Sequence, residues 1–180
     1  MKKYILLASI ILSVVSCGKL TRDREVDKSK LRGYDYRLFQ KTPAWELAKA
    51  VWDDDFKKIN ELTKKDTNLI NYQDSKFGET LLFLTMWHNQ KETFKLLLSL
   101  GANPNIHDTY DGTSPIIEAC KGRLNIEFVI ILSLESKSIV RRQSKLNISL
   151  GTVVTYWSLR KNTSFTAELQ SILNREIKLT

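Results

Sequence analysis

Apolar residues recur along the middle of the chain three or four positions apart, and the whole arrangement returns after about 34 residues. Each copy contains two short stretches with one apolar side, a pattern typical of two amphipathic helices. A helix pair that returns at a fixed period predicts units that stack and bury a shared core. Ile59, Phe94 and Phe128 are equivalent positions in the three copies, as are Leu62, Leu97 and Ile131. The residues on the apolar sides of the paired stretches are Leu47, Ala50 and Val51 followed by Phe56, Ile59 and Leu62; Leu82, Thr85 and Met86 followed by Phe94, Leu97 and Leu98; and Ile116, Ala119 and Cys120 followed by Phe128, Ile131 and Leu132.

The segment between the second and third copies marks one helix end and one helix start. A leucine-rich run ends at Gly101, where a left-handed helix cap costs least. Pro104 prevents the helix from resuming. Asp111 and Gly112 predict a tight turn, and Ser114 followed by a proline predicts an N-cap and a first helical residue. The order is therefore helix end, loop, turn, helix start.

This junction resembles the one between two ankyrin repeats, in which a Gly-Ala-Asp/Asn loop is followed by Gly-x-Thr-Pro-Leu-His. Residues 78–82 and 112–116 are two such turn segments, each beginning with glycine, at a spacing of about 34 residues. The resemblance implies an all-α, ankyrin-repeat solenoid of about four helix pairs joined by tight turns. An unrelated small helical bundle is the alternative, and the matching turn segments argue against it. The implied repeats lie near 42–74, 75–107, 108–140 and 147–175, the last of them degenerate.

The first residues predict export rather than a folded element. Two lysines precede an almost wholly apolar run over residues 4–15, which is too short for a span of ~20 residues. Residues 14–17 then resemble a bacterial lipobox, which implies a signal peptide over 1–16 and lipidation of Cys17; an uncleaved anchor is the alternative. Gly18 stands where lipoproteins of the inner membrane usually carry Asp. By resemblance this favours the outer membrane of a diderm bacterium, facing the periplasm.

Residues 17–41 predict a lipidated polar tether that ends in an N-terminal cap, ahead of a repeat domain over 42–180. The stretch up to residue 30 mixes both charges with few apolar residues, as solvated linkers do. Tyr34, Tyr36, Leu38 and Phe39 then indicate a segment that covers the first repeat. The formal charge of +8 is scattered along the chain, whereas DNA binding needs a concentrated basic face.

The sequence predicts no enzyme, no cofactor and no metal site. It contains no G-x-S-x-G elbow, phosphate-binding glycine loop or H-E-x-x-H helix. His88 and His107 lie far apart in the repeat plan. The acidic run at residues 53–55 falls at a turn between helices, which favours an N-cap over a cation site. Cys120 has no partner if Cys17 carries lipid, and is interpreted as a small buried thiol.

Binding to a protein partner is the function class that is left. Ankyrin repeats present their turn tips and the concave edge of each first helix, and this resemblance implies a set of contact positions. Three of these positions carry tryptophan, an interface anchor, although large aromatic residues are also common in cores. The implied contact residues are Trp52, Asp53, Lys76, Phe77, Glu79, Trp87, His88, Tyr110, Asp111, Lys121, Tyr156 and Trp157.

Small exported ankyrin lipoproteins resemble immunity proteins of type VI secretion phospholipase effectors. The resemblance implies a lipid-anchored protein, monomeric on its own, that binds a cognate toxin in the periplasm and covers its active site. An envelope adaptor with a different protein partner is the alternative. A small-molecule carrier is disfavoured, because solenoids lack a closed apolar pocket.

Overall fold

The computed structural model describes residues 22–121, 124–125 and 127–132. The signal peptide and Cys17 lie outside the described residues, as do the implied fourth repeat and the contact positions Tyr156 and Trp157. The side chain of Cys120 is also outside the description.

The described chain is helical, which confirms the all-α class for this part of the protein. Its helices are α2 (Trp45–Trp52), α3 (Phe56–Lys65), α4 (Leu81–Trp87), α5 (Lys91–Ser99) and α6 (Pro115–Cys120), and residues 127–132 are also helical. Three 3₁₀ helices accompany them: η1 (Lys28–Lys30), η2 (Tyr36–Phe39) and η3 (Thr67–Asn71). No strand forms within these ranges, where one antiparallel bridge joins Gln73 to Thr80.

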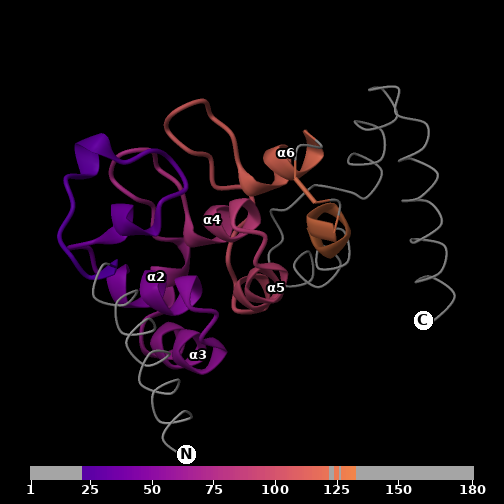
Figure 1. The fold of residues 1–180 in the computed structure, drawn as a ribbon. Coiled ribbons are helices and arrows are strands. Elements are labelled where there is room, and N and C mark those ends of the chain that lie inside the picture. Colours follow the sequence, from indigo (N-terminus) through magenta and orange to yellow (C-terminus); the bar gives the residue numbers. More distant parts are fainter. Residues whose placement is uncertain (1–21, 122–123, 126, 133–180) are drawn as a thin grey trace, which may run out of the picture.

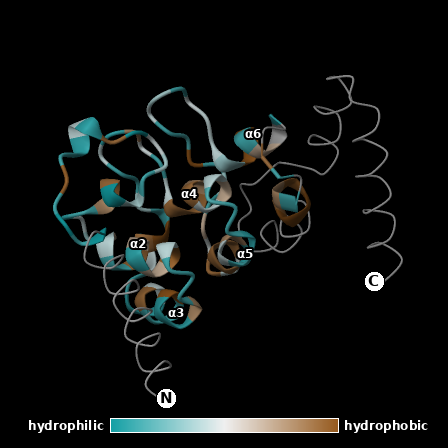
Figure 2. Ribbon diagram, viewed as in Figure 1, coloured by the Kyte–Doolittle hydropathy of each residue, from teal (hydrophilic) through white to brown (hydrophobic). Residues whose placement is uncertain are grey.

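The helices lie in two rows. Helices α2, α4 and α6 stand side by side in one row, and α3 and α5 lie in a second row beneath the first (Figure 1). Helix α2 packs on α3 and helix α4 on α5, and α4 also packs against α2 and α6. Helix α4 is buried from Leu81 to Met86 and is hydrophobic along most of its length (Figure 2).

Caps set the helix starts where the sequence places them. The side chains of Thr80 and Ser114 accept hydrogen bonds from backbone N–H groups in the first turns of α4 and α6. Asp55 caps α3 in the same way, which confirms its predicted N-cap role. Gly101 has φ +101° and Gly112 has φ +71°, so both adopt the left-handed conformation that the pattern predicts.

The aligned apolar positions form the core. Ile59, Phe94 and Phe128 are fully buried, and the rings of Phe94 and Phe128 meet edge to face at 5.0 Å. The expectation that Phe56 faces inward is wrong, since its side chain is 44% exposed. Phe56 is the first residue of α3, and the buried row of that helix begins one turn later at Ile59.

Within the described residues, no helix has both the length and the apolar composition that a membrane span needs.

The N-terminal segment, defined here as residues 22–40, is folded against the helices. Tyr36, Leu38 and Phe39 are buried, and η2 packs against α2. The preceding residues are held as well, because the Gln40 amide donates to the carbonyls of Arg22 (3.1 Å) and Arg24 (3.0 Å). A solvated tether, the expectation from composition, is therefore not what residues 22–30 form. A few buried apolar side chains anchor a segment whose average composition is polar.

Candidate functional site

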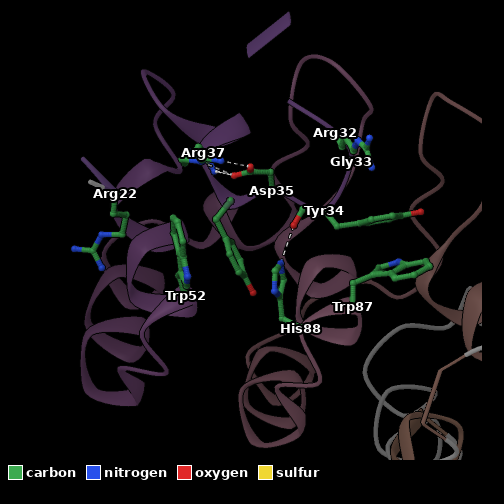
Figure 3. Close-up of a pocket in the computed structure, with 10 residues that line it drawn as sticks. Arg22, Arg32, Gly33, Tyr34, Asp35, Arg37, Trp52, Trp87 and His88 are labelled. Atoms are coloured by element: carbon green, nitrogen blue, oxygen red, sulfur yellow. Dashed lines mark hydrogen bonds and ion pairs between the residues drawn. The ribbon is translucent and has the colours of Figure 1, made fainter. Parts of the chain in front are cut away.

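An open groove of about 610 Å³ lies between the N-terminal segment and the C-terminal ends of α2 and α4 (Figure 3). The segment supplies Arg22 and residues 32–37, and the helix ends supply Trp52, Trp87 and His88. Three of the implied contact residues thus come together in one groove. The N-terminal segment forms the other wall of the groove, which the sequence pattern did not predict.

Tyr36 is stacked between two of the implied contact residues. Its ring lies 5.5 Å from the ring of Trp52 and 4.9 Å from the ring of His88, within 23° and 26° of parallel. Its hydroxyl donates to the side-chain oxygen of Gln90. Burial raises the pKa of Tyr36 well above its ordinary value, so the hydroxyl keeps its proton. Tyr36 therefore fills the space between the ends of α2 and α4.

Tyr34 stacks on Trp87, another of the implied contact residues. Its ring stacks on Trp87 at 4.0 Å and meets the edge of Phe83 at 5.9 Å. Its carbonyl accepts a hydrogen bond of 2.7 Å from His88 Nε2. Burial, followed by the nearby Glu79, raises the pKa of Tyr34 to about 12. Both Trp52 and Trp87 are half-buried, and the chain's own tyrosines occupy one face of each.

No regular period in the sequence predicts that both tyrosines face the helix ends. Tyr34 lies in a turn with φ +67°, and Tyr36 is the first residue of η2, so the backbone between them is neither an extended strand nor one continuous helix. The local pattern also does not say which helix ends the two rings meet, because their partners Trp52, Trp87 and His88 lie on later helix ends of the chain.

Glu79 and Lys76 fasten the N-terminal segment. Glu79 is only 4% exposed, and its Oε2 accepts a 2.7 Å hydrogen bond from the Tyr34 N–H. A Cβ on Gly33 would lie 2.8 Å from the other carboxylate oxygen, so glycine permits this close approach. Lys76 Nζ donates to the carbonyls of Ser29 (2.8 Å) and Leu31 (2.7 Å). Both residues were expected to face a partner, but Glu79 is buried under the segment and Lys76 is bonded to it.

Burial also changes the acidity of Glu79. The loss of solvent raises its pKa from 4.5 to about 7, against the effect of the Tyr34 hydrogen bond, which lowers it. The carboxylates of Asp74 and Asp108 add a smaller upward contribution. The Glu79 carboxyl beneath the N-terminal segment therefore changes its charge near neutral pH.

Two aspartates hold the loops before α4 and α6. The Asp108 carboxylate accepts from the backbone N–H groups of Tyr110 (3.0 Å), Asp111 (2.9 Å) and Gly112 (3.0 Å). Asp74 accepts three backbone N–H groups of its own loop at 2.7–2.9 Å. Sequence analysis did not single out these residues. Their signal is an aspartate four positions before the left-handed glycine of each loop.

Aromatic residues stand at the tips of these loops. Tyr110 is 81% exposed and meets the ring of Phe77 edge-on at 6.0 Å. The Thr109 N–H donates to the Phe77 carbonyl at 2.7 Å, which joins the two loops. Lys76 Nζ lies 4.8 Å from the centre of the Phe77 ring. The implied contact residues Tyr110 and Phe77 are thus adjacent on a hydrogen-bonded framework.

The other implied contact residues are charged and already paired. Asp53 is exposed and bonds to the guanidinium of Arg22. Asp111 accepts from the Thr113 N–H at 3.0 Å. Lys121 Nζ donates to the Thr113 hydroxyl at 2.7 Å and pairs with Glu118 at 2.9 Å. These contacts position the three side chains and use part of their hydrogen-bonding capacity.

Within the described ranges, no three His, Cys, Asp or Glu residues gather closely enough to hold a metal ion.

The chain matches no protein-family model, no curated protein and no solved structure in comparisons with each. What the groove and loops can bind is therefore inferred from the geometry of their own residues. Aromatic faces, guanidinium groups and a rigid loop pair are suited to recognition of another molecule.

Proposed function

We propose that this chain is a non-catalytic protein-binding lipoprotein built from ankyrin-type helix pairs. The observation that carries the proposal is the exposed Tyr110, which stands with Phe77 on two loops that hydrogen bonds hold in place. Large aromatic anchors on preorganised loops lose little conformational freedom on binding. The adjoining groove offers further aromatic surface, linked to the same loops through Lys76.

Local geometry supports the repeat part of the proposal. Gly78 and Gly112 have the same φ of +71°, and Asp54 and Asn89 are both left-handed after a first helix. The loop aspartates and the N-caps of α4 and α6 occur at the same spacing of about 34 residues. Helix pairs in two rows, each contacting its neighbours, agree with a stacked repeat architecture.

The proposed class of partner comes from the resemblance of the sequence to immunity proteins of type VI secretion phospholipase effectors. In this proposal the protein is anchored by lipid on Cys17 at the outer membrane, and its partner is a secreted lipase-type toxin. Binding then inhibits the toxin by covering its active site, which requires rigid complementary surface and no catalytic group on this chain.

Affinity capture tests the protein-binding function. The acylated protein would be cross-linked in its native envelope, purified, and its captured proteins quantified by mass spectrometry beside those of Tyr110→Ala. Phe56→Ala is the matched control, because Phe56 is an exposed aromatic residue on α3, outside the loops and the groove. We expect Tyr110→Ala to reduce capture of one specific protein about tenfold, a loss of about 1.4 kcal/mol. Equal capture by both variants would contradict the proposal.

A gene for a lipase or another toxin beside this one would identify the partner class. An envelope-assembly operon in that place would instead favour the adaptor.

A further inference from the structure

The residues that line the groove include more cationic than acidic side chains. Three arginines line it, and Asp35 is the one acidic residue in the lining. Arg37 forms a forked pair with Asp35, with Nε and Nη2 at 3.0 and 2.7 Å from the carboxylate oxygens. Arg22 bonds to Asp53 at the edge of the groove. Arg32 is exposed and has no hydrogen-bond or ion-pair partner among the described residues.

Most of the guanidinium donors in the groove are therefore unused by the described part of the chain. Each guanidinium carries five N–H donors in a fixed plane. Arg37 directs two of its nitrogens at Asp35, and Arg22 directs one at Asp53. The Nε of Arg22 is buried without a hydrogen-bond partner, 3.7 Å from the Asp23 carboxylate, and is not open to a ligand. Arg32 is exposed, and its donors are the ones that the groove presents for acceptors that the described residues do not supply.

Aromatic rings lie between these charges. Arg22 stands at the Trp52 end of the groove, Arg32 at the end near Tyr34 and Trp87, and Arg37 between them (Figure 3). A matching ligand would carry carboxylates at intervals with apolar groups between them.

We propose that the groove binds an acidic segment of the partner protein, with its carboxylates on the arginines and its apolar side chains on the tryptophan edges. This inference rests on the proposed protein-binding function and specifies the chemistry of the bound segment. Arginine suits the role, since its fork can donate two parallel hydrogen bonds to one carboxylate. Arg32 is the residue with the most donors to offer.

The acidic side chains around the groove favour a peptide over a nucleic acid. Asp23, Asp35 and Asp53 lie within ion-pair distance of the groove arginines. A continuous line of phosphates would meet these carboxylates as well as the guanidinium groups. A peptide can place a carboxylate at each arginine and a neutral side chain at each aspartate.

Fluorescence anisotropy with the full chain tests this assignment. The probe is a fluorescein-labelled peptide of alternating Glu and Leu, compared with a peptide in which Gln replaces every Glu. We expect the acidic peptide to bind at least about tenfold more tightly than the neutral one, and its affinity to fall with added salt. Arg32→Gln should weaken that binding about tenfold. Arg24→Gln, an exposed arginine of the same segment outside the groove, should change it less than about twofold.

Several outcomes would overturn the assignment: equal binding of the acidic and neutral peptides, equal effects of the two arginine substitutions, or tighter binding of a single-stranded oligonucleotide or phosphatidylglycerol vesicles. Arg32→Lys provides a second variant that keeps the charge and removes the fork, so it should fall between wild type and Arg32→Gln. Circular dichroism confirms that each variant is folded. If the partner is captured but Arg32→Gln leaves peptide binding unchanged, the protein-binding function stands and this inference fails. If the acidic peptide binds but no partner is captured, the groove has the proposed preference for acidic peptides and the proposed protein-binding function fails.

Discussion

Glu79 is the residue whose chemistry depends most on its surroundings. It is a carboxyl group buried under the N-terminal segment, with one hydrogen bond from the Tyr34 N–H and with Gly33 packed against it. Such a group favours its protonated form, because burial penalises the charge. Glu79 is therefore a titratable contact beneath the chain's own N-terminal segment.

Stability should fall as the pH rises from about 4.5 to about 7. The pKa of Glu79 is raised to about 7 in the folded protein from an ordinary value of 4.5, so the folded state retains a proton that the unfolded state loses. The stabilisation is complete below pH 4.5 and lost above pH 7. We expect a decrease in the free energy of unfolding on the order of 2 kcal/mol.

Urea unfolding at pH 4.5, 6 and 8 measures this decrease. Glu79→Gln keeps an acceptor for the Tyr34 N–H without a titrating proton, so its stability should vary less over the same range. An identical pH dependence in wild type and variant would show that another group is responsible.

At the scale of elements, the loops before α4 and α6 are built alike. In each loop an aspartate carboxylate takes up three backbone N–H groups, and a left-handed glycine follows. These bonds replace the regular hydrogen bonding that a loop lacks. The loop tips can therefore be exposed and still be ordered, which is the combination that an aromatic contact residue requires.

Removal of the Asp108 carboxylate should loosen the Tyr110 loop. Asp108→Ala leaves three N–H groups without their acceptor, and we expect a loss of about 1–2 kcal/mol in the free energy of unfolding. Amide hydrogen exchange of residues 110–112 should accelerate. Asp53→Ala is the control, since among the described residues that carboxylate contacts the side chain of Arg22 and no backbone N–H. Unchanged exchange in Asp108→Ala would mean that the loop is held by its other contacts.

At the scale of the whole molecule, the N-terminal segment and the helices form one folded unit. The segment's tyrosines stack on Trp52, His88 and Trp87, and its Leu38 and Phe39 are in the core. The groove exists only because this segment lies across the helix ends. Any partner that binds there contacts both parts of the chain at once.

Deletion of residues 1–40 should lower the melting temperature by several degrees and shift tryptophan emission to longer wavelength. The deletion exposes Trp52, Trp87 and the apolar surface under Leu38 and Phe39, and buried side chains of this kind contribute about 1.5–3 kcal/mol each. Deletion of residues 1–21 is the control. Equal emission and melting of the two truncated proteins would show that the segment does not contribute to stability.

Local signals in the sequence were enough for the helices and their ends. The apolar spacing predicted Ile59, Phe94 and Phe128 in the core. The capping preferences of Ser114 and Gly101 predicted a helix start and a helix end. These features depend on residues within one or two helical turns. Phe56 shows the limit of the pattern, because its spacing fits an inward position and its place at the start of α3 leaves it exposed.

By itself, the sequence determined the helical class, the turn positions and the set of residues near the helix ends. Only the tertiary structure decided what those residues do: Tyr34 and Tyr36 stack on rings about 50 positions away, and Glu79 is buried under Gly33. The physical reason is the distance along the chain between the residues that interact. Caps, left-handed turns and amphipathic periodicity arise from neighbours in the chain, whereas the groove, its arginines and the pKa of Glu79 arise from segments that meet only when the chain has folded.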